Sequence, residues 1–398
     1  MIRRKTAVSI ALAGAAAVLL AACGGTSQSS SSTASSSSGS ADSAVQAANA
    51  AVTAGQKGNE AEPPSWSGRP PTGKDIWIIS CGQIAESCSR PAQAAMEAAQ
   101  KLGWTAKIVD GKFDPSVAGG LIRQAVAAKA AGIVDVGFDC STITGPLTQA
   151  RDAGVPVVAS VALDCADPAV KSGPSLLTSP KLIAQYGSLS EYLQAWGALR
   201  ANWVIAKTNG NAKVILFGAS DFPLSQEITK GFKATLASCS GCSVVDEPSY
   251  LNADVGAGLQ AKAAQSIVAH PTANAIVVDW NSTLTGGVLA AVQQSGRRSS
   301  MVVGGGEGMS TDLQLLSEGQ IDAVFYFNQD WNGYAAVDDL ARLLAGTSQA
   351  DVLNVAQGNG FTLMDKSNLP TTLPAATGPL PTLTIDFRAS YLKAWGVS

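Results

Sequence analysis

Residues 75–110 read DIWIISCGQIAESCSRPAQAAMEAAQKLGWTAKIVD, and this stretch decides the fold. Residues 76–80 are a strand candidate. Residues 91–102 read as a helix that starts at Pro91 and ends before Gly103, and residues 104–110 read as strand again. Continuously apolar strands separated by helices are typical of a parallel sheet that is covered on both faces. The stretch therefore predicts the first strand–helix–strand unit of an α/β sheet.

The same alternation continues and then restarts. Strands are predicted at 133–138 and 155–161, with helices at 114–132 and 146–153. A second series alternates helices with strands, the strands being predicted at 214–217, 243–246, 275–279, 301–304 and 322–328. Its helices are predicted at 189–207, 224–237, 255–269, 284–295 and 310–318, and a further helix at 331–345 is left over. Two series in 398 residues predict two doubly wound domains with a ligand site between them, at the carboxyl ends of the strands.

The first 23 residues, MIRRKTAVSIALAGAAAVLLAAC, have the order of an export signal. A positive start precedes a short apolar run at 7–20, which is shorter than the ~20 residues of a comfortable membrane span. The ending Leu20-Ala21-Ala22-Cys23 resembles the lipobox of bacterial lipoproteins. We therefore expect a signal peptide over 1–22 and lipidation of Cys23. A plain secretory signal and twin-arginine export remain the alternatives.

The next segment reads as a tether. A serine-rich run to about residue 45 has few apolar groups, so it cannot bury enough surface to offset the entropy of ordering. Residues 46–72 read as extended linker that the pairs Pro63-Pro64 and Pro70-Pro71 stiffen. The sequence thus predicts a flexible tether over 23–72 and a folded part held outside the cytoplasm at the cell membrane.

Cysteines oxidise in that compartment. Apart from Cys23, the chain has six: Cys81, Cys88, Cys140, Cys165, Cys239 and Cys242. Six cysteines allow fifteen pairings. We favour the local one, 81–88, 140–165 and 239–242, because each pair then lies in one supersecondary unit.

Several chemistries find no support in the residues. The net charge is −3 and no basic stripe exists for a phosphate backbone, so nucleic acid is not expected as a partner. His270 is the single histidine, which excludes multi-histidine zinc sites and leaves a serine triad only His270 to use. The G-x-S-x-G elbow and the P-loop are missing. We expect no enzyme, metal or cofactor.

A family resemblance rests on five phrases in order along residues 73–365. They are 93–109, Gly154-Val155-Pro156-Val157-Val158, Lys230-Gly231-Phe232, 269–277 and 281–289. In this order they resemble the type I periplasmic binding proteins of the ribose/galactose class, the substrate-binding subunits of ABC importers. The resemblance implies two lobes joined by three chain crossings, which we place near 175–188, 327–331 and 360–380. The lobes would be 73–180 with 329–362, and 181–328 with 363–398.

The resemblance also implies ligand positions. The loop after the first strand supplies Gln83 and Glu86, and the stretch after the third supplies Asp139. In the second lobe, Gln226 stands where the family often has arginine. Asn281, Glu307 and Asn328 match its strand-end and hinge positions. The family's Asp-Arg sugar clamp is lost here, and Asp164 is the nearest carboxylate. Trp280 is a candidate for stacking on a sugar or cation, with packing at the sheet end as the alternative.

These residues lead us to expect a monomeric, lipid-anchored protein that binds a sugar or polyol and passes it to an ABC permease. An amine-bearing solute is the alternative ligand. A receptor of the same fold that feeds a membrane sensor, and an extracytoplasmic hydrolase, are the alternative functions. The pair Cys81–Cys88 would fix the loop that presents Gln83 and Glu86 and lower the entropy cost of ordering it.

Overall fold

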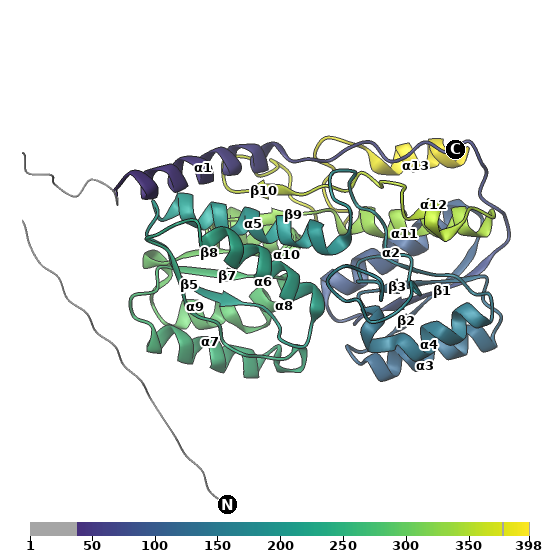
Figure 1. Cartoon of the computed structure of the whole chain (residues 1–398), viewed down its shortest axis with the longest axis horizontal. Helices are drawn as coiled ribbons and strands as arrows, with labels where there is room; N and C mark the ends of the chain where they lie inside the picture. The colour runs from purple at the N-terminus through teal and green to yellow at the C-terminus, as the bar shows by residue number, and fades with distance from the viewer. Residues whose placement is uncertain (1–37, 376–377, 398) are drawn as a thin grey trace, which may run out of the picture.

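The computed structural model describes residues 38–375 and 378–397, with side chains from residue 42 onward. Two α/β lobes lie side by side, and a layer of N- and C-terminal segments runs along one side of both (Figure 1). The predicted signal peptide and Cys23 lie outside the described residues. Within the described part, no helix is long and apolar enough to cross a membrane.

The N-terminal lobe is built on a parallel sheet in the order β2-β1-β3-β4. Alternate residues of β1 face opposite cores: Ile76 and Ile78 pack beneath α2, α11 and α13, whereas Trp77 and Ile79 pack beneath α3 and α4. The strands are β1 (Asp75–Ser80), β2 (Thr105–Asp110), β3 (Gly132–Val136) and β4 (Val157–Ala159). The helices are α2 (Glu86–Lys101), α3 (Pro115–Ala127), α4 (Cys140–Asp152), α11 (Gln329–Leu344), α12 (Gln349–Val352) and α13 (Phe387–Trp395).

The C-terminal lobe repeats this plan with a parallel sheet in the order β6-β5-β7-β8. One face of β5 packs on α5 and α6, and the other packs on α7, α9 and α10. The strands are β5 (Lys213–Phe217), β6 (Ser243–Asp246), β7 (Ala275–Val278) and β8 (Val302–Gly304), with an antiparallel pair β9 (Val324–Tyr326) and β10 (Thr362–Met364) beyond β8. The helices are α5 (Leu189–Lys207), α6 (Pro223–Leu236), α7 (Ala257–Ala269), α8 (Asn281–Thr283), α9 (Leu289–Gln294) and α10 (Ser310–Glu318).

Between β1 and β10, three chain crossings join the lobes, as packing on either side of each shows. Leu177 packs in the N-terminal core and Leu182 in the C-terminal one. Around the second crossing, Phe327 packs in the C-terminal core and Trp331 in the N-terminal one. The third crossing falls before Phe361, which packs in the C-terminal lobe. The two doubly wound lobes and the three-crossing hinge are therefore confirmed.

The terminal segments differ from expectation. In place of a flexible tether, residues 38–57 form helix α1 (Ser38–Lys57), whose Ala48 is fully buried against the C-terminal lobe. The next residues pass to the N-terminal lobe, where Trp66 lies over the Arg342 guanidinium at 4.9 Å and the Pro71 carbonyl accepts from Trp104 Nε1 at 2.6 Å. The chain end also changes lobe: α13 packs on α11 rather than on the C-terminal lobe, because the Phe387 ring stacks on Trp331.

The three disulfides are the local ones: Cys81–Cys88, Cys140–Cys165 and Cys239–Cys242. The first closes the loop between β1 and α2. The second ties the start of α4 to the segment after β4, and the third closes the turn between α6 and β6. Two of the three thus lie at carboxyl ends of strands in the N-terminal lobe.

Candidate functional site

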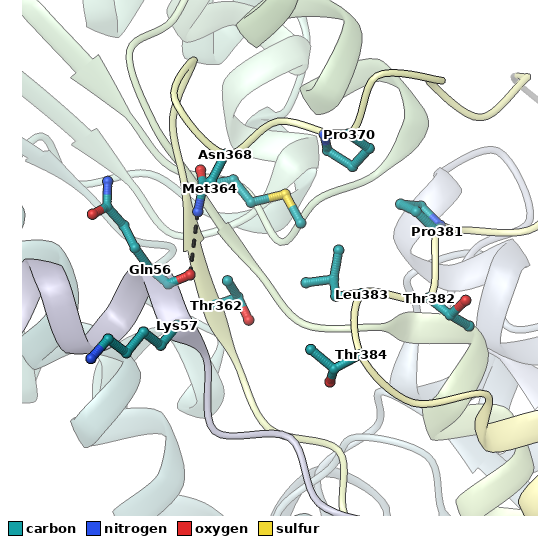
Figure 2. A pocket seen from close by; sticks show the side chains of 10 residues that line it. All are labelled: Gln56, Lys57, Thr362, Met364, Asn368, Pro370, Pro381, Thr382, Leu383 and Thr384. Carbon is teal, nitrogen blue, oxygen red and sulfur yellow. Dashed lines mark hydrogen bonds between the residues drawn. The ribbon is translucent and has the colours of Figure 1, made fainter.

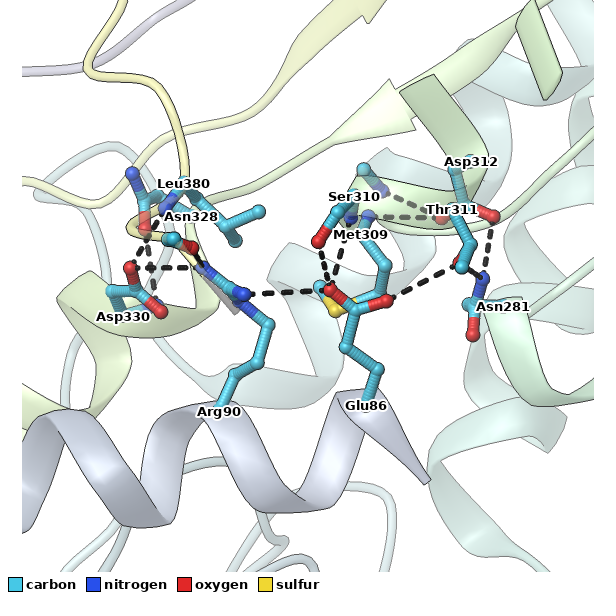
Figure 3. A network of polar contacts seen from close by, with 12 residues as sticks. Glu86, Arg90, Asn281, Met309, Ser310, Thr311, Asp312, Asn328, Asp330 and Leu380 are labelled. Atoms are coloured by element: carbon cyan, nitrogen blue, oxygen red, sulfur yellow. Dashed lines mark hydrogen bonds and ion pairs between the residues drawn. The ribbon is translucent and has the colours of Figure 1, made fainter. Parts of the chain in front are cut away.

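A carboxylate of the N-terminal lobe reaches across to the C-terminal lobe. Glu86, the first residue of α2, accepts from the backbone N–H of Ser310 at 3.0 Å and from its hydroxyl. The second oxygen of Glu86 accepts from the Thr311 hydroxyl at 3.2 Å. Ser310 is the first residue of α10, so the carboxylate accepts from a backbone N–H at the start of a helix (Figure 3). This contact marks the candidate site between the lobes.

The loop before α2 holds Glu86 in place. The disulfide between Cys81 and Cys88 closes the loop, and the Ser80 hydroxyl donates to the Cys88 carbonyl at 3.1 Å. Within the loop, the Ala85 N–H donates to the Gly82 carbonyl at 3.0 Å, which forms a turn. A Cβ at Gly82 would overlap the ring of Phe113, so a side chain at that position would require the half-exposed ring to move.

Arg90 lies one helical turn beyond Glu86 and pairs with it at 3.4 Å. Its guanidinium also pairs with Asp330 at 3.3 Å and donates to the Gly378 carbonyl at 2.7 Å. Asp330 accepts further from Arg388 at 3.0 Å and from the Leu380 N–H at 2.9 Å. The network in Figure 3 therefore joins α2, the start of α11 and the C-terminal segment.

Behind Ser310 and Thr311 lies a buried polar set in the C-terminal lobe. The Asn281 side chain donates to Thr311 Oγ1 and to Asp312 Oδ1, both at 2.8 Å. Its backbone N–H donates to Glu307 Oε2 at 2.6 Å. Asn281 starts α8 after β7, and Glu307 follows β8, so two adjacent strands bring these residues together at their carboxyl ends.

Burial shifts the pKa values of the ionisable groups in and beneath this set. It raises the pKa of Glu307 well above its usual range, and the nearby Asp312 carboxylate raises it further. Burial likewise raises the pKa of Asp312 to about 7. Beneath them, burial lowers the pKa of Arg200 to about 9; its guanidinium donates to the Asp279 carbonyl at 2.9 Å and lies 3.6 Å from the Trp196 ring centre. Burial thus favours the neutral acid form of Glu307.

Trp280 packs at the sheet end, which was the alternative to stacking on a ligand. Its indole is only 7% exposed and packs among Trp196, Phe222 and Phe327. The indole N–H donates to the Ser225 hydroxyl at 2.9 Å, and that hydroxyl donates to Asp279 at 2.5 Å. The ring is therefore part of the core behind the site, and it offers little face to a ligand.

The other predicted ligand residues lie outside the interlobe contact and stabilise backbone. Asp164 accepts from the Leu176 and Leu177 N–H groups at 3.0 and 2.9 Å. Asn328 caps α11 by accepting from Asp330 and Trp331 N–H groups at 3.0 and 3.2 Å. Asp139 accepts from the Leu163 N–H at 2.6 Å, and burial raises its pKa to about 7.

Gln83 and Gln226, the remaining predicted ligand residues, lie elsewhere in the structure. The Gln83 backbone N–H donates to Asp110 at 3.1 Å, while its buried Nε2 has no hydrogen-bond partner. Gln226 donates to the Ser220 carbonyl at 2.8 Å and lines a cavity of about 590 Å³ between the loops after β5 and β6. The structure therefore brings together Glu86, Asn281 and Glu307, with Trp280 packed behind them, and separates the rest.

Sequence reasoning missed several members of the site: Arg90, Arg200, Ser310, Thr311 and Asp312. Each is polar in a predicted helix or at its start, where such residues usually serve as caps or face solvent. The stretch Ser310-Thr311-Asp312 follows a glycine-rich turn directly after a strand, and that position was the available signal. Arg200 offered no signal, because only the fold shows that it is 1% exposed.

A second cavity lies away from the interlobe contact. It measures about 310 Å³ and is lined by the end of α1, by β10 and by the C-terminal segment (Figure 2). There the Asn368 side chain donates to the Gln56 carbonyl at 3.4 Å. Among the described residues, no group of three or more histidine, cysteine, aspartate or glutamate side chains is placed to hold a metal ion.

Several solved structures share the fold. A glucose-galactose binding protein from Geobacillus stearothermophilus superposes with a TM-score of 0.63 at 19% identity, over 75% of this chain and 100% of its own. An ABC transporter solute binding protein from Agrobacterium vitis, bound with α-D-tagatopyranose, gives 0.64 at 18%, over 75% and 96%. The 5-methylthioribose transporter solute binding protein from Thermotoga lettingae gives 0.62 at 16%, over 82% and 100%. All three support the type I fold.

In sequence, no curated protein matches significantly. The match to a family is nonetheless broad, because it begins in the first turn of α2 and runs past the end of α11, through the whole C-terminal sheet and through β2, β3 and β4 of the N-terminal one. The match over residues 88–348 is to the periplasmic binding protein domain, and the chain therefore belongs to this family.

Proposed function

We propose that the chain is an extracytoplasmic, lipid-anchored solute-binding protein that takes up a small sugar or polyol between its lobes and delivers it to an ABC permease. The observation that carries this proposal is the contact of Glu86 with Ser310 and Thr311. It brings polar groups of both lobes together at the carboxyl ends of their strands, where doubly wound folds bind ligands. A solute held there would be enclosed by both lobes.

The chemistry of the buried set suits hydroxyl groups. In the neutral acid form, which burial favours, Glu307 can both donate and accept, and its Oε1 has no hydrogen-bond partner in the protein. Asn281 and Thr311 also combine donors with acceptors. Polyols and sugars present the same mixture of donors and acceptors. Three relatives of the same fold bind or transport carbohydrates according to their names, which favours this solute class.

Ligand panels test the proposal. We expect a saturable rise in melting temperature with one class of sugar or polyol, because a ligand that binds only the folded state stabilises it by about 2.7 kcal/mol at a hundred times its Kd. Isothermal calorimetry should give the same affinity. Asn281→Ala should weaken binding strongly. Gln226→Ala, which removes an exposed amide outside the interlobe contact, is the matched control and should bind as the wild type does.

Two results would contradict the proposal. One is a panel of sugars and polyols at millimolar concentration that leaves the melting temperature unchanged. The other is a solute whose binding is lost in Gln226→Ala and kept in Asn281→Ala, which would place the site in the cavity between the β5 and β6 loops.

The anchor has a separate test. The wild-type chain should stay with the cell membranes and carry acyl chains at Cys23 that mass spectrometry detects, whereas Cys23→Ser should carry none. A membrane-bound wild-type chain without acyl chains at Cys23 would contradict lipidation at this residue.

A further inference from the structure

The interlobe contact is made by the protein's own carboxylate. Both oxygens of Glu86 accept from the C-terminal lobe, one from Ser310 and the other from Thr311. The Glu86 side chain is 18% exposed, so these bonds are largely shielded from water. Bonds of this kind, from neutral donors to a carboxylate, are stronger than those between neutral groups. The lobes are therefore held together by groups that belong to the chain itself.

The same donors connect directly with the buried polar set. Thr311 Oγ1, which donates to Glu86, accepts from the Asn281 side chain at 2.8 Å. The Asn281 N–H in turn donates to Glu307 at 2.6 Å. Glu86 is thus the last acceptor in a series of hydrogen bonds that runs through Thr311 and Asn281 to Glu307, and a solute at Asn281 and Glu307 would join the same series. A solute bound at these groups would compete with Glu86 for the Thr311 proton, since a hydroxyl has one proton to donate.

Release of Glu86 does not leave its charge unpaired. Arg90 Nη1 lies 3.4 Å from Glu86 on the same helix, and Asp330 holds the other side of that guanidinium at 3.3 Å. The α2 and α11 helices that carry Arg90 and Asp330 pack together in the N-terminal core. When the lobes separate, Glu86 therefore keeps a cationic partner in its own lobe, and the contact with α10 can open and close reversibly.

We propose that Glu86 is a latch that holds the lobes closed when no solute is bound, and that a solute must release it to enter. This inference rests on the proposed function for its solute, whereas its test measures lobe closure in protein without solute. Differential stability of the closed and open states then sets their populations, and Glu86 supplies part of that difference.

Solute-free protein provides the test. In the full chain, Glu86→Ala removes every bond of the latch, and the ratio of closed to open molecules should fall about tenfold, as expected for loss of hydrogen bonds to a charged group. Small-angle scattering should then show a larger radius of gyration. Hydrogen exchange should show faster exchange of the amides at the start of α10. Glu86→Gln should give an intermediate effect.

A matched control lies on the same helix. Glu97 accepts from the Tyr334 hydroxyl at 2.9 Å within the N-terminal lobe, so Glu97→Ala should leave both scattering and α10 exchange unchanged. Circular dichroism confirms folding of each variant, and Glu86→Gln serves if Glu86→Ala does not fold. Unchanged scattering and exchange in both Glu86 variants would overturn the latch. They would leave the proposed function intact, because that depends on stabilisation by solutes.

Discussion

Cys81 and Cys88 close a disulfide ring that contains Glu86, the residue that contacts α10 of the opposite lobe. The bond spans a sequence separation of 7 and lies where β1 gives way to α2. Because Cys81 precedes α2 and Cys88 lies in its first turn, the disulfide restrains that turn against the end of β1. The position of the latch depends on a covalent link as well as on packing.

Removal of this disulfide should open the lobes. Cys81→Ser with Cys88→Ser should raise α10 amide exchange in the solute-free protein, because the first turn of α2 becomes free to move. Chain-entropy arguments give a stability loss of about 2 to 3 kcal/mol. Cys239→Ser with Cys242→Ser is the control, since it removes a short disulfide outside the interlobe contact at a similar cost of about 2 kcal/mol. Equal α10 exchange in both double variants would show that the first disulfide is only structural.

Stability should fall as the pH rises from about 4 to about 7, because of Asp139. Burial raises its folded pKa to about 7, whereas an unfolded aspartate titrates near 3.9. The folded state binds more protons in that window, so stability is greatest below it and is lost as the pH rises. Asp312, with its pKa raised to about 7, adds to the same trend.

Asp139→Asn isolates this contribution. Urea unfolding at pH 5 and pH 8 should show a smaller difference in the variant than in the wild type, by about 2 kcal/mol. Asp152→Asn is the control, since that carboxylate is 62% exposed. A variant with the full wild-type difference would show that Asp139 titrates normally in the folded protein.

The close crossing of α5 and α6 depends on glycine. A Cβ on Gly231 would overlap the carbonyl oxygen of Gln194, and one on Gly197 would overlap that of Ile228. Gly231→Ala should therefore destabilise the protein by about 1 to 3 kcal/mol, as overpacking usually does. Gly120→Ala in α3 faces open space and should be neutral or stabilising. Denaturant midpoints compare the two, and equal midpoints would contradict this packing.

The sequence predicted the sheets because their central strands are buried on both faces and so read as apolar runs, as β1 and β7 do. Gly231 stands in one of the family phrases, and the structure explains that glycine by its close approach to Gln194. Among the candidate site residues, Asn281 and Glu307 follow strands whose ends meet. Residues chosen for charge alone, such as Asp164, instead hold backbone N–H groups.

What escaped prediction depends on contacts between distant segments. Arg200 is distant in sequence from Asp279 and Gly306, whose carbonyls it binds. Helix α1 escaped because its buried side chains are small: Ala48 and Val52 give little apolar periodicity beside the serine-rich run. Such a helix is stabilised by packing on α5 and only weakly by its own pattern.

Two substitutions in α1 distinguish a packed helix from a flexible tether. Ala48 is fully buried in the C-terminal core, and Ala47 beside it is exposed. Ala48→Asp would bury a charge without a partner or detach the helix, so it should lower stability by about 2 kcal/mol or more and speed trypsin cleavage after Lys57. Ala47→Asp adds the same charge on the solvent side and should change neither. If residues 38–57 behaved as a tether, both variants would unfold and be cleaved like the wild type.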